Sequence, residues 1–272
     1  MAQAFRDRLR CRVGLPYRTE RLMSSTGPSR LPLSRSTRLL EALCGGVIVS
    51  CQAPEGSPLR HPAHMAAMAE AAAIAGAVGI RANGPDDVSA IRARVTLPIV
   101  GIDKRPDVDP VAYITPSLAS VQTLVDAGSD LIAIDATLRL RGGKGARSAA
   151  ELIAQVRSTF DDLPLMADVS NVAEGVAAAA AGADIIATTL SGYTDASAQP
   201  DGPDLDLIAE LVAAQPRPIV AEGRFSTPEQ VRAAFAAGAH AVVVGTAITD
   251  PVALAKKFVA AAPIVTAEAK RA

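Results

Sequence analysis

Short apolar runs recur along the chain, each bounded by glycine, proline or polar residues. They show no polar alternation, and this pattern is typical of strands buried on both faces, as in a parallel sheet. Eight such runs are present, at residues 47–52, 77–81, 97–102, 131–135, 163–168, 184–189, 218–222 and 241–245.

Alanine-rich segments with helical spacing separate these runs. The signals include a proline at the predicted start of the helix at 228 and a capping-box pattern in Ser226-Thr227-Pro228-Glu229. Thr115-Pro116 is interpreted as the cap of the helix that runs to Ala127. An Ala-Gly step recurs where helices meet strands, at residues 75–76, 127–128, 181–182 and 237–238. Eight strands alternating with helices predict a single (β/α)8 TIM barrel.

The first 40 residues differ in composition from the rest. They hold nine arginines, no lysine and only two acids, Asp7 and Glu20, which leaves 18 basic and 26 acidic residues in 41–272. A segment rich in Arg, Ser and Thr resembles a transit peptide or a disordered arm. We predict that residues 1–40 are a disordered extension and that residues 41–272 form the barrel.

Composition narrows the function classes. The 272 residues carry a formal net charge of -1 and no tryptophan, which gives no reason to expect nucleic acid or membranes as partners. No apolar run reaches the roughly 18 residues that a membrane span needs. The cysteines, Cys11, Cys44 and Cys51, form no even set and no CxxC pair, which indicates a reducing compartment, the cytoplasm. His61 and His64 lack an evident third ligand, so no zinc site is expected.

The residues at the predicted strand ends are the candidates for chemistry. In this barrel the loops after the strands build the active site. Reading the ends in order gives Gln52, Arg81, Lys104, Asp135, Asp168, Thr189, Glu222 and Gly245. Three carboxylates, one lysine and one arginine at successive strand ends are hard to explain by chance, although single members of the set could simply position loops.

Two glycine turns suggest an anion site. Gly223-Arg224 follows the seventh strand and Gly245-Thr246 follows the eighth, where these barrels commonly bind phosphate. Backbone N–H groups can hold an anion there without dedicated side chains. The alternative interpretation is that these glycines only turn the chain.

A lysine facing carboxylates, with no metal-ligand set and no nucleotide fingerprint, favours proton transfer at a carbon next to a carbonyl group. Such chemistry needs a base that removes the proton and an acid that polarises or protonates the oxygen. Schiff-base formation at Lys104 is the competing use of the same residue.

The strand ends also carry a family resemblance that covers roughly residues 44–260. The matching stretches are Ile48-Val49-Ser50-Cys51-Gln52-Ala53, Gly79-Ile80-Arg81-Ala82-Asn83-Gly84, Leu97-Pro98-Ile99-Val100-Gly101-Ile102 with Lys104, Tyr113-Ile114-Thr115-Pro116, Ile134-Asp135-Ala136-Thr137, Met166-Ala167-Asp168, Thr188-Thr189-Leu190-Ser191-Gly192-Tyr193-Thr194, Ala221-Glu222-Gly223-Arg224 and Val244-Gly245 with Ala247-Ile248-Thr249. In these stretches the chain resembles the bacterial N-acetylmannosamine-6-phosphate 2-epimerases.

The resemblance implies an isomerase of amino-sugar catabolism, the route that degrades sialic acid and N-acetylmannosamine. Such an enzyme interconverts the 6-phosphates of N-acetylmannosamine and N-acetylglucosamine by inverting C2, without metal or organic cofactor. The resemblance implies the following residue roles: Lys104 and Glu222 as the acid/base pair, with the direction of proton transfer left open; Gln52, Arg81 and Asp168 on the sugar and its N-acetyl group; Tyr193 and Thr194 at the mouth; and Gly223, Arg224, Gly245 and Thr246 facing the phosphate. A homodimer is also expected.

The chain departs from the family's pattern after Ile248-Thr249. The family usually has arginine there, whereas this chain has Asp250 followed by Pro251. An aspartate would repel a phosphate, but it is a good N-cap for a helix that begins with proline. The alternatives to the epimerase are another phosphosugar isomerase, a Schiff-base aldolase on the same barrel, or a sugar-phosphate binding protein without turnover.

Overall fold

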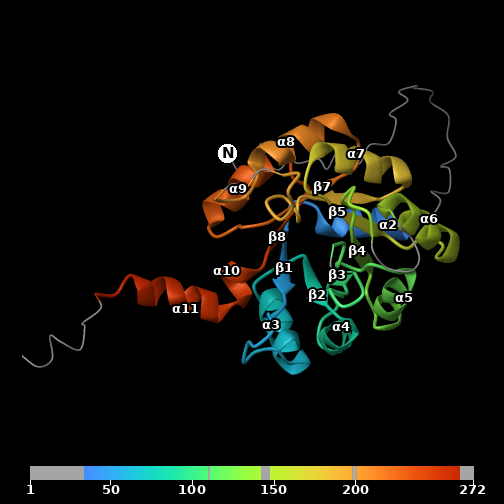
Figure 1. The fold of residues 1–272 in the computed structure, drawn as a ribbon. Coiled ribbons are helices and arrows are strands. Elements are labelled where there is room, and N and C mark those ends of the chain that lie inside the picture. Colours follow the sequence, from blue (N-terminus) through green and yellow to red (C-terminus); the bar gives the residue numbers. More distant parts are fainter. Residues whose placement is uncertain (1–33, 110, 142–147, 198, 200, 264–272) are drawn as a thin grey trace, which may run out of the picture.

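Eight parallel strands close into a barrel in the order of the sequence (Figure 1). The computed structural model describes residues 34–109, 111–141, 148–197, 199 and 201–263. The strands are β1 (Val47–Cys51), β2 (Gly79–Asn83), β3 (Ile99–Ile102), β4 (Leu131–Asp135), β5 (Leu165–Asp168), β6 (Ile185–Ala187), β7 (Ile219–Glu222) and β8 (Ala241–Val244). β8 pairs with β1 through Val47, Ile48 and Val49, which completes the closure.

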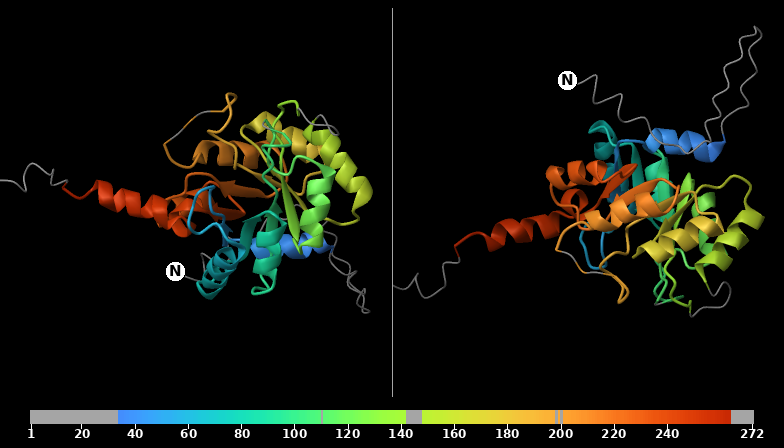
Figure 2. Two further views of the ribbon diagram at one scale, coloured as in Figure 1. Left: turned by 60° about the horizontal axis from the view of Figure 1, so that its bottom comes forward. Right: turned by 90° about the horizontal axis from the view of Figure 1, so that it is seen from above.

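Helices alternate with the strands and form the outer layer (Figure 2). They are α3 (Pro62–Ile74), α4 (Pro85–Arg92), α5 (Leu118–Asp126), α6 (Ala149–Thr159), α7 (Val172–Ala181), α8 (Leu205–Ala214), α9 (Pro228–Ala236), the short α10 (Thr246–Thr249) and α11 (Pro251–Ala260); α2 (Arg35–Leu43) precedes β1. The predicted (β/α)8 barrel is therefore confirmed. β6 is three residues shorter than the predicted run.

The signals that end and begin helices are mostly confirmed. Each glycine of the recurring Ala-Gly step has a positive φ, between 89° and 108°, and this left-handed conformation is the usual helix stop. At α9, Pro228 is the first helical residue as predicted, whereas the capping box is formed by Thr227 and Gln230, one residue later than the predicted spacing from Ser226 to Glu229.

Thr115-Pro116 is not a helix cap, contrary to the prediction. Helix α5 starts two residues later, with Ser117 as its N-cap. Thr115 is fully buried with a φ of 48°, and its hydroxyl accepts a hydrogen bond from the backbone N–H of Asp103. Thr115 therefore bonds to Asp103 across the loop instead of capping the helix.

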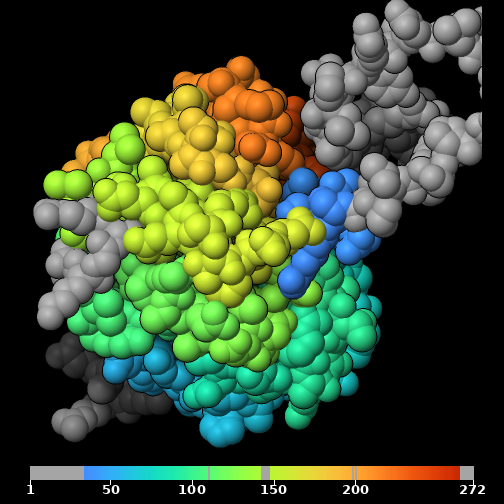
Figure 3. Space-filling view, turned by 90° about the vertical axis from the view of Figure 1, so that its right-hand side faces the viewer, coloured from blue at the N-terminus to red at the C-terminus, as the bar shows by residue number. Residues whose placement is uncertain are grey.

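The barrel interior and α2 share one apolar cluster. Ile48, Val100, Met166 and Val243 point inward, and Leu39, Leu40 and Leu43 of α2 pack against the same cluster. Amphipathic α2 therefore closes one end of the barrel, and in the space-filling view it lies across the surface, coloured blue (Figure 3). The predicted boundary at residue 40 is thus too late, because 35–40 belong to this helix. Residues 1–33 of the predicted extension lie outside the described residues.

Helix α11 differs from the other helices of the outer layer. It projects away from the barrel in every view (Figures 1 and 2), and none of its residues is buried. Phe258 and Val259 are 73% and 71% exposed. Within the described parts of the chain, no helix is both long enough and apolar enough to span a membrane.

Candidate active site

A cavity of about 600 Å³ opens at the carboxyl ends of the strands, a size typical of sites for small metabolites. Nine of the predicted site residues line it: Gln52, Arg81, Lys104, Tyr193, Glu222, Gly223, Arg224, Gly245 and Thr246. Asp168 lies directly behind Arg81, and its fully buried carboxylate accepts two hydrogen bonds from that guanidinium.

Lys104 is held by the loop between β3 and α5. Its backbone N–H donates to Asn83 Oδ1 over 2.9 Å, and it forms an isolated antiparallel bridge with Ile114. The preceding residue, Asp103, exchanges two hydrogen bonds with Thr115: its N–H donates to the Thr115 hydroxyl and its carbonyl accepts from the Thr115 N–H. The loop therefore folds back on itself and fixes the point from which the Lys104 side chain leaves.

Glu222, at the end of β7, is joined to Asp168 by two shared partners. Arg81 contacts Glu222 Oε2 at 2.9 Å and Asp168 Oδ2 at 2.6 Å. The Thr189 hydroxyl lies 2.8 Å from Asp168 Oδ1 and 2.9 Å from Glu222 Oε2. One hydroxyl hydrogen can be donated to only one of these oxygens at a time, so the second contact is a hydrogen bond only when a carboxyl carries a proton.

The environment raises the pKa of Glu222 and lowers that of Lys104. Burial raises the pKa of Glu222 most, Arg81 lowers it, and Asp168 raises it further. The pKa of Lys104 is lowered most by desolvation at the cavity walls, although the residue as a whole is exposed to solvent. Arg81 lowers this pKa further, whereas Glu222 and Asp168 raise it. Both groups are shifted toward the neutral range, where a general acid or base is most effective.

Gln52 offers a free acceptor in the cavity. Its amide nitrogen donates to the Ser50 hydroxyl over 2.7 Å, and its Oε1 is buried without a hydrogen-bond partner among the described residues. A buried acceptor without a partner is costly, so a ligand hydroxyl or amide N–H would relieve that cost.

The turns after β7 and β8 offer backbone donors. The N–H groups of Gly223, Arg224, Gly245 and Thr246 donate to no acceptor within the described part of the chain, and all four residues line the cavity. Gly223 has a φ of 118° and Arg224 a φ of 57°. Successive unpaired N–H groups in a left-handed turn are a recurrent anion-binding arrangement.

The Arg224 side chain fastens a loop. Its guanidinium donates to the carbonyls of Ser191 and Gly202 and lies 5.5 Å from the centre of the Tyr193 ring. A Cβ on Gly192 would lie only 2.4 Å from an Arg224 nitrogen. Arg224 therefore holds the β6–α8 loop against β7, with Tyr193 beside the cavity.

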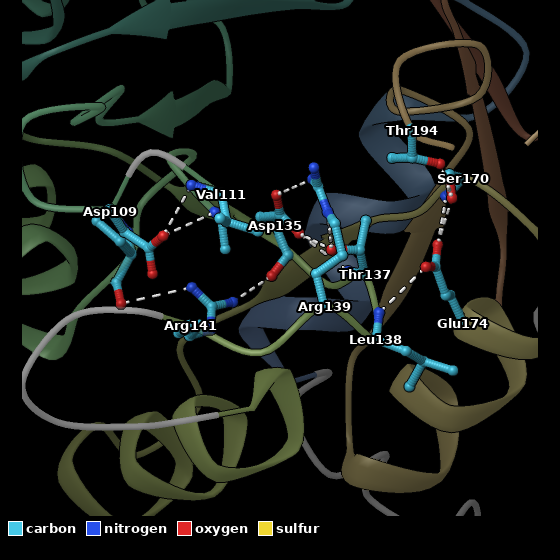
Figure 4. A network of polar contacts seen from close by, with 12 residues as sticks. Asp109, Val111, Asp135, Thr137, Leu138, Arg139, Arg141, Ser170, Glu174 and Thr194 are labelled. Carbon is cyan, nitrogen blue, oxygen red and sulfur yellow. Dashed lines mark hydrogen bonds and ion pairs between the residues drawn. The ribbon is translucent and has the colours of Figure 1, made fainter. Parts of the chain in front are cut away.

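Thr194 belongs to a neighbouring polar network (Figure 4). Its buried hydroxyl lies 2.9 Å from the Ser170 hydroxyl, which donates to Glu174. Glu174 also accepts from the backbone N–H of Leu138, so this network ties together the loops after β4, β5 and β6. Thr194 is not one of the described residues that line the cavity.

Asp135, a strand-end carboxylate, also serves a loop. It accepts hydrogen bonds from Thr137 and from Arg139, at 2.6 Å and 3.0 Å (Figure 4). Arg141 donates to the Asp135 carbonyl from the same loop. This carboxylate organises the β4–α6 connection and, within the described chain, does not line the cavity.

The cavity also contains residues that sequence reasoning did not assign. Asn83, Tyr113 and Arg60 line it, and Thr189 bridges the two carboxylates. Thr189 was visible at a strand end, but its partners were not. Tyr113 and Arg60 lie in loops, where neither periodicity nor strand position indicates which way a side chain points.

The described residues contain no group of three or more His, Cys, Asp or Glu side chains arranged to hold a metal ion. The closely placed acids, Asp168 and Glu222, are both engaged by Arg81. A guanidinium therefore occupies the position between these two carboxylates.

Comparison with known proteins agrees with this geometry. Residues 65–263 match a family model described as "Putative N-acetylmannosamine-6-phosphate epimerase". A protein of Cutibacterium acnes described as "Putative N-acetylmannosamine-6-phosphate 2-epimerase" is 47% identical over 223 residues, which cover 81% of this chain and 95% of that one. A protein of the same description from Caldanaerobacter subterraneus is 44% identical over 221 residues, covering 81% and 92%.

Solved structures show the same relationship. The N-acetylmannosamine-6-phosphate 2-epimerase from Clostridium perfringens superposes with a TM-score of 0.77 at 36% identity, over 88% of this chain and all of that one. Thiamine phosphate pyrophosphorylase from Pyrococcus furiosus, with a TM-score of 0.54 at 16% identity, shares the fold alone. The sequence matches and the superposed barrel agree, and the chain belongs to the N-acetylmannosamine-6-phosphate epimerase family.

Proposed function

We propose that this protein interconverts N-acetylmannosamine 6-phosphate and N-acetylglucosamine 6-phosphate by removing and returning the proton at C2. The observation that carries the proposal is the placement of Lys104 and Glu222 in one cavity, at the ends of β3 and β7. These strands are four apart in a closed order of eight, so they face each other across the mouth. Groups on opposite sides of a bound sugar can act on its C2 proton and on its oxygen at the same time.

The proposed chemistry uses both shifted groups. One member of the Lys104–Glu222 pair takes the C2 proton, and the other stabilises or protonates the sugar oxygen as negative charge develops there. The raised pKa of Glu222 makes its carboxyl hold a proton more readily than an ordinary glutamate, and the lowered pKa of Lys104 makes its amine release one more readily than an ordinary lysine. We leave open which member acts as the base in each direction.

The remaining assignments follow from the cavity walls. Gln52 presents an unpaired acceptor to the sugar or its N-acetyl group, and Arg81 lines the cavity while Asp168 fixes its guanidinium. Tyr193 is 60% exposed at the mouth, and Thr194 supports its loop from behind. Gly223, Arg224, Gly245 and Thr246 offer backbone N–H groups to the 6-phosphate.

The activity is tested by following each sugar phosphate by NMR after addition of the enzyme. Lys104→Met and Glu222→Gln are expected to lower kcat at least about a hundredfold, the usual range for losing a general acid or base. Glu229→Gln is the matched control, because Glu229 is an exposed residue on α9 that pairs with Arg232. Near-normal turnover by either cavity variant would contradict the residue assignment.

Schiff-base chemistry remains the second candidate, because a lysine of lowered pKa is also suited to attack a carbonyl. Borohydride reduction in the presence of the phosphosugar distinguishes the two. The epimerase predicts unmodified Lys104 after reduction and full activity on dilution. A reduced sugar adduct on Lys104 would favour the aldolase.

We further propose a homodimer that uses α11. This helix buries none of its residues in the monomer and exposes Leu254, Phe258 and Val259. Exposed apolar side chains that cluster on one element are typical of protein contacts, and an identical helix on a second copy supplies an apolar partner through twofold symmetry.

The cytoplasm is the proposed location. The support is the chemistry of a phosphorylated sugar, which is a metabolite of the cell interior. Activity confined to the membrane or secreted fraction after cell fractionation would contradict this location.

A further inference from the structure

The cations that line the cavity differ in how far they are already engaged. Among the described residues, four basic ones line it: Arg60, Arg81, Lys104 and Arg224. Arg81 is buried and paired with Asp168 and Glu222, and the Arg224 guanidinium donates to the carbonyls of Ser191 and Gly202. Lys104 belongs to the proposed acid/base pair, which leaves Arg60.

The Arg60 side chain is exposed and forms no hydrogen bond or ion pair with another described residue. Its backbone, by contrast, is fixed. The Arg60 N–H donates to the Ser57 carbonyl over 3.0 Å, and the next residue, His61, caps α3 by accepting from the Ala63 N–H. An ordered turn therefore presents to the cavity a guanidinium without a hydrogen bond or ion pair to another described residue; it interacts with the Asp87 carboxylate through space and lowers the pKa of that group against the effect of burial.

Arg60 lies on the side of the mouth that carries the turn after β8. Strands β8 and β1 are neighbours in the closed barrel, and the Thr249 hydroxyl donates to the Ser50 carbonyl over 2.7 Å. Pro58 and Leu59 share a second hollow with Pro251 and Val252. The β1–α3 loop and the α10–α11 segment are thus adjacent, and Arg60 and Thr246 line one cavity.

This part of the rim is otherwise acidic. Glu55 and Asp250 line the cavity here, and the Asp250 carboxylate caps α11 by accepting from the Ala253 N–H over 3.0 Å. Two carboxylates near an anion site repel the anion. Unpaired N–H groups of Gly245 and Thr246 offset this only in part, so a phosphate there needs a full positive charge.

We infer that the Arg60 guanidinium is the side-chain cation that binds the 6-phosphate, and that it completes a cradle of backbone N–H groups at Gly223, Arg224, Gly245 and Thr246. A guanidinium can donate two parallel hydrogen bonds to phosphate oxygens. The inference rests on the proposed function for the identity of the ligand. This chain carries Asp250 where the family usually has arginine, and Arg60 then supplies the arginine that binds the phosphate.

The test measures KM and kcat on N-acetylmannosamine 6-phosphate for Arg60→Ala and for the unaltered protein. A charge-assisted hydrogen bond corresponds to a change of roughly 10- to 100-fold in binding. We expect KM to rise at least about tenfold with kcat within about threefold, since Arg60 is not a member of the proposed acid/base pair. Turnover of unphosphorylated N-acetylmannosamine should be unchanged. An unchanged KM, or equal losses on both sugars, would overturn the inference.

Matched variants separate charge from structure. Arg94→Ala removes a half-exposed arginine that pairs with Glu70 and should leave KM unaltered. Asp250→Asn keeps a side chain that caps α11 but removes a rim charge, and should lower KM for the phosphosugar. A rise of KM in Asp250→Asn, or a rise in Arg94→Ala equal to that in Arg60→Ala, would contradict the inference.

Inorganic phosphate makes the test independent of turnover. Calorimetry should show phosphate binding to the unaltered protein and binding at least about tenfold weaker to Arg60→Ala, with thermal unfolding unchanged. This result would support the anion site even if no sugar phosphate were epimerised, in which case only the proposed function would fail. Equal phosphate binding by both proteins, or none by the unaltered protein, would overturn the inference.

Discussion

At the scale of single residues, the site depends on one guanidinium that serves two carboxylates. Arg81 is 1% exposed and reaches both Asp168 and Glu222. Burial acts against its charge, but these two carboxylates raise its pKa above the ordinary value, so it stays charged. Arg81 can thus keep Glu222 in place in either protonation state, while Thr189 accepts or donates as the proton count changes.

The pH dependence of kcat/KM follows from the protonation of Glu222 and Lys104. Catalysis needs one proton shared between Glu222 and Lys104, whichever of them carries it. The rate falls at low pH, where both are protonated, and at high pH, where both are deprotonated. Since the pKa of Glu222 is raised and that of Lys104 is lowered, the two limbs of kcat/KM should lie closer together than ordinary Glu and Lys values would place them.

Measurement of kcat/KM across pH checks this expectation. In Glu222→Gln the residual activity should lose the acidic limb, whereas Glu229→Gln should keep both limbs. A profile that stays flat down to the ordinary range of a glutamate would contradict the raised pKa.

At the scale of elements, the β3–α5 loop shows how a local exception positions Lys104. Thr115 adopts a left-handed φ that is unusual for a β-branched residue. Its hydroxyl and its N–H both bond to Asp103, and the bonding across the loop maintains a conformation that costs of order 1–3 kcal/mol.

Thr115→Val keeps the shape of the side chain but leaves the buried Asp103 N–H without an acceptor. We expect a loss of about 1–3 kcal/mol in the free energy of unfolding and a lower kcat, because Lys104 follows Asp103 directly. Thr115→Ser retains the hydroxyl and should retain kcat. Denaturant unfolding and turnover measure the two effects, and unaltered kcat in the destabilised valine variant would show that the loop does not position Lys104.

The same loop marks the limit of prediction from sequence. Apolar runs and Ala-Gly stops identify the strands because burial on both faces and left-handed helix ends leave a local pattern. Lys104 and Glu222 could be placed at one mouth because parallel strands all end on the same side. Thr115-Pro116 imitates a helix cap, and only the contact with Asp103 decides otherwise. The directions of Arg60 and Arg224 depend on neighbouring loops and leave no local signal.

At the scale of the whole molecule, the two ends of the described chain behave differently. Helix α2 completes the barrel, since Leu39, Leu40 and Leu43 pack onto its interior cluster and His240 contacts the Leu40 carbonyl. Helix α11 leaves the barrel with its apolar residues exposed. The first end stabilises the monomer, and the second is available for a contact with another copy.

Charge placed on α11 tests the proposed dimer. Phe258→Glu should shift the protein from dimer to monomer in light scattering, because a charge buried between two copies is costly. Arg232→Glu changes an exposed residue on α9 and should leave the mass unaltered. A monomeric unaltered protein, or a Phe258→Glu variant that stays dimeric, would contradict the use of α11.

Lys104 and Glu222 are proposed to move the C2 proton. The most direct test of this proposal is the appearance of deuterium at C2, followed by NMR during epimerisation of N-acetylmannosamine 6-phosphate in heavy water. We expect deuterium at C2 of the product formed by the unaltered protein and by Glu229→Gln. Incorporation should be at least about a hundredfold slower in Lys104→Met and in Glu222→Gln. Product that keeps its original C2 hydrogen, or incorporation at the normal rate in either cavity variant, would contradict the proposal.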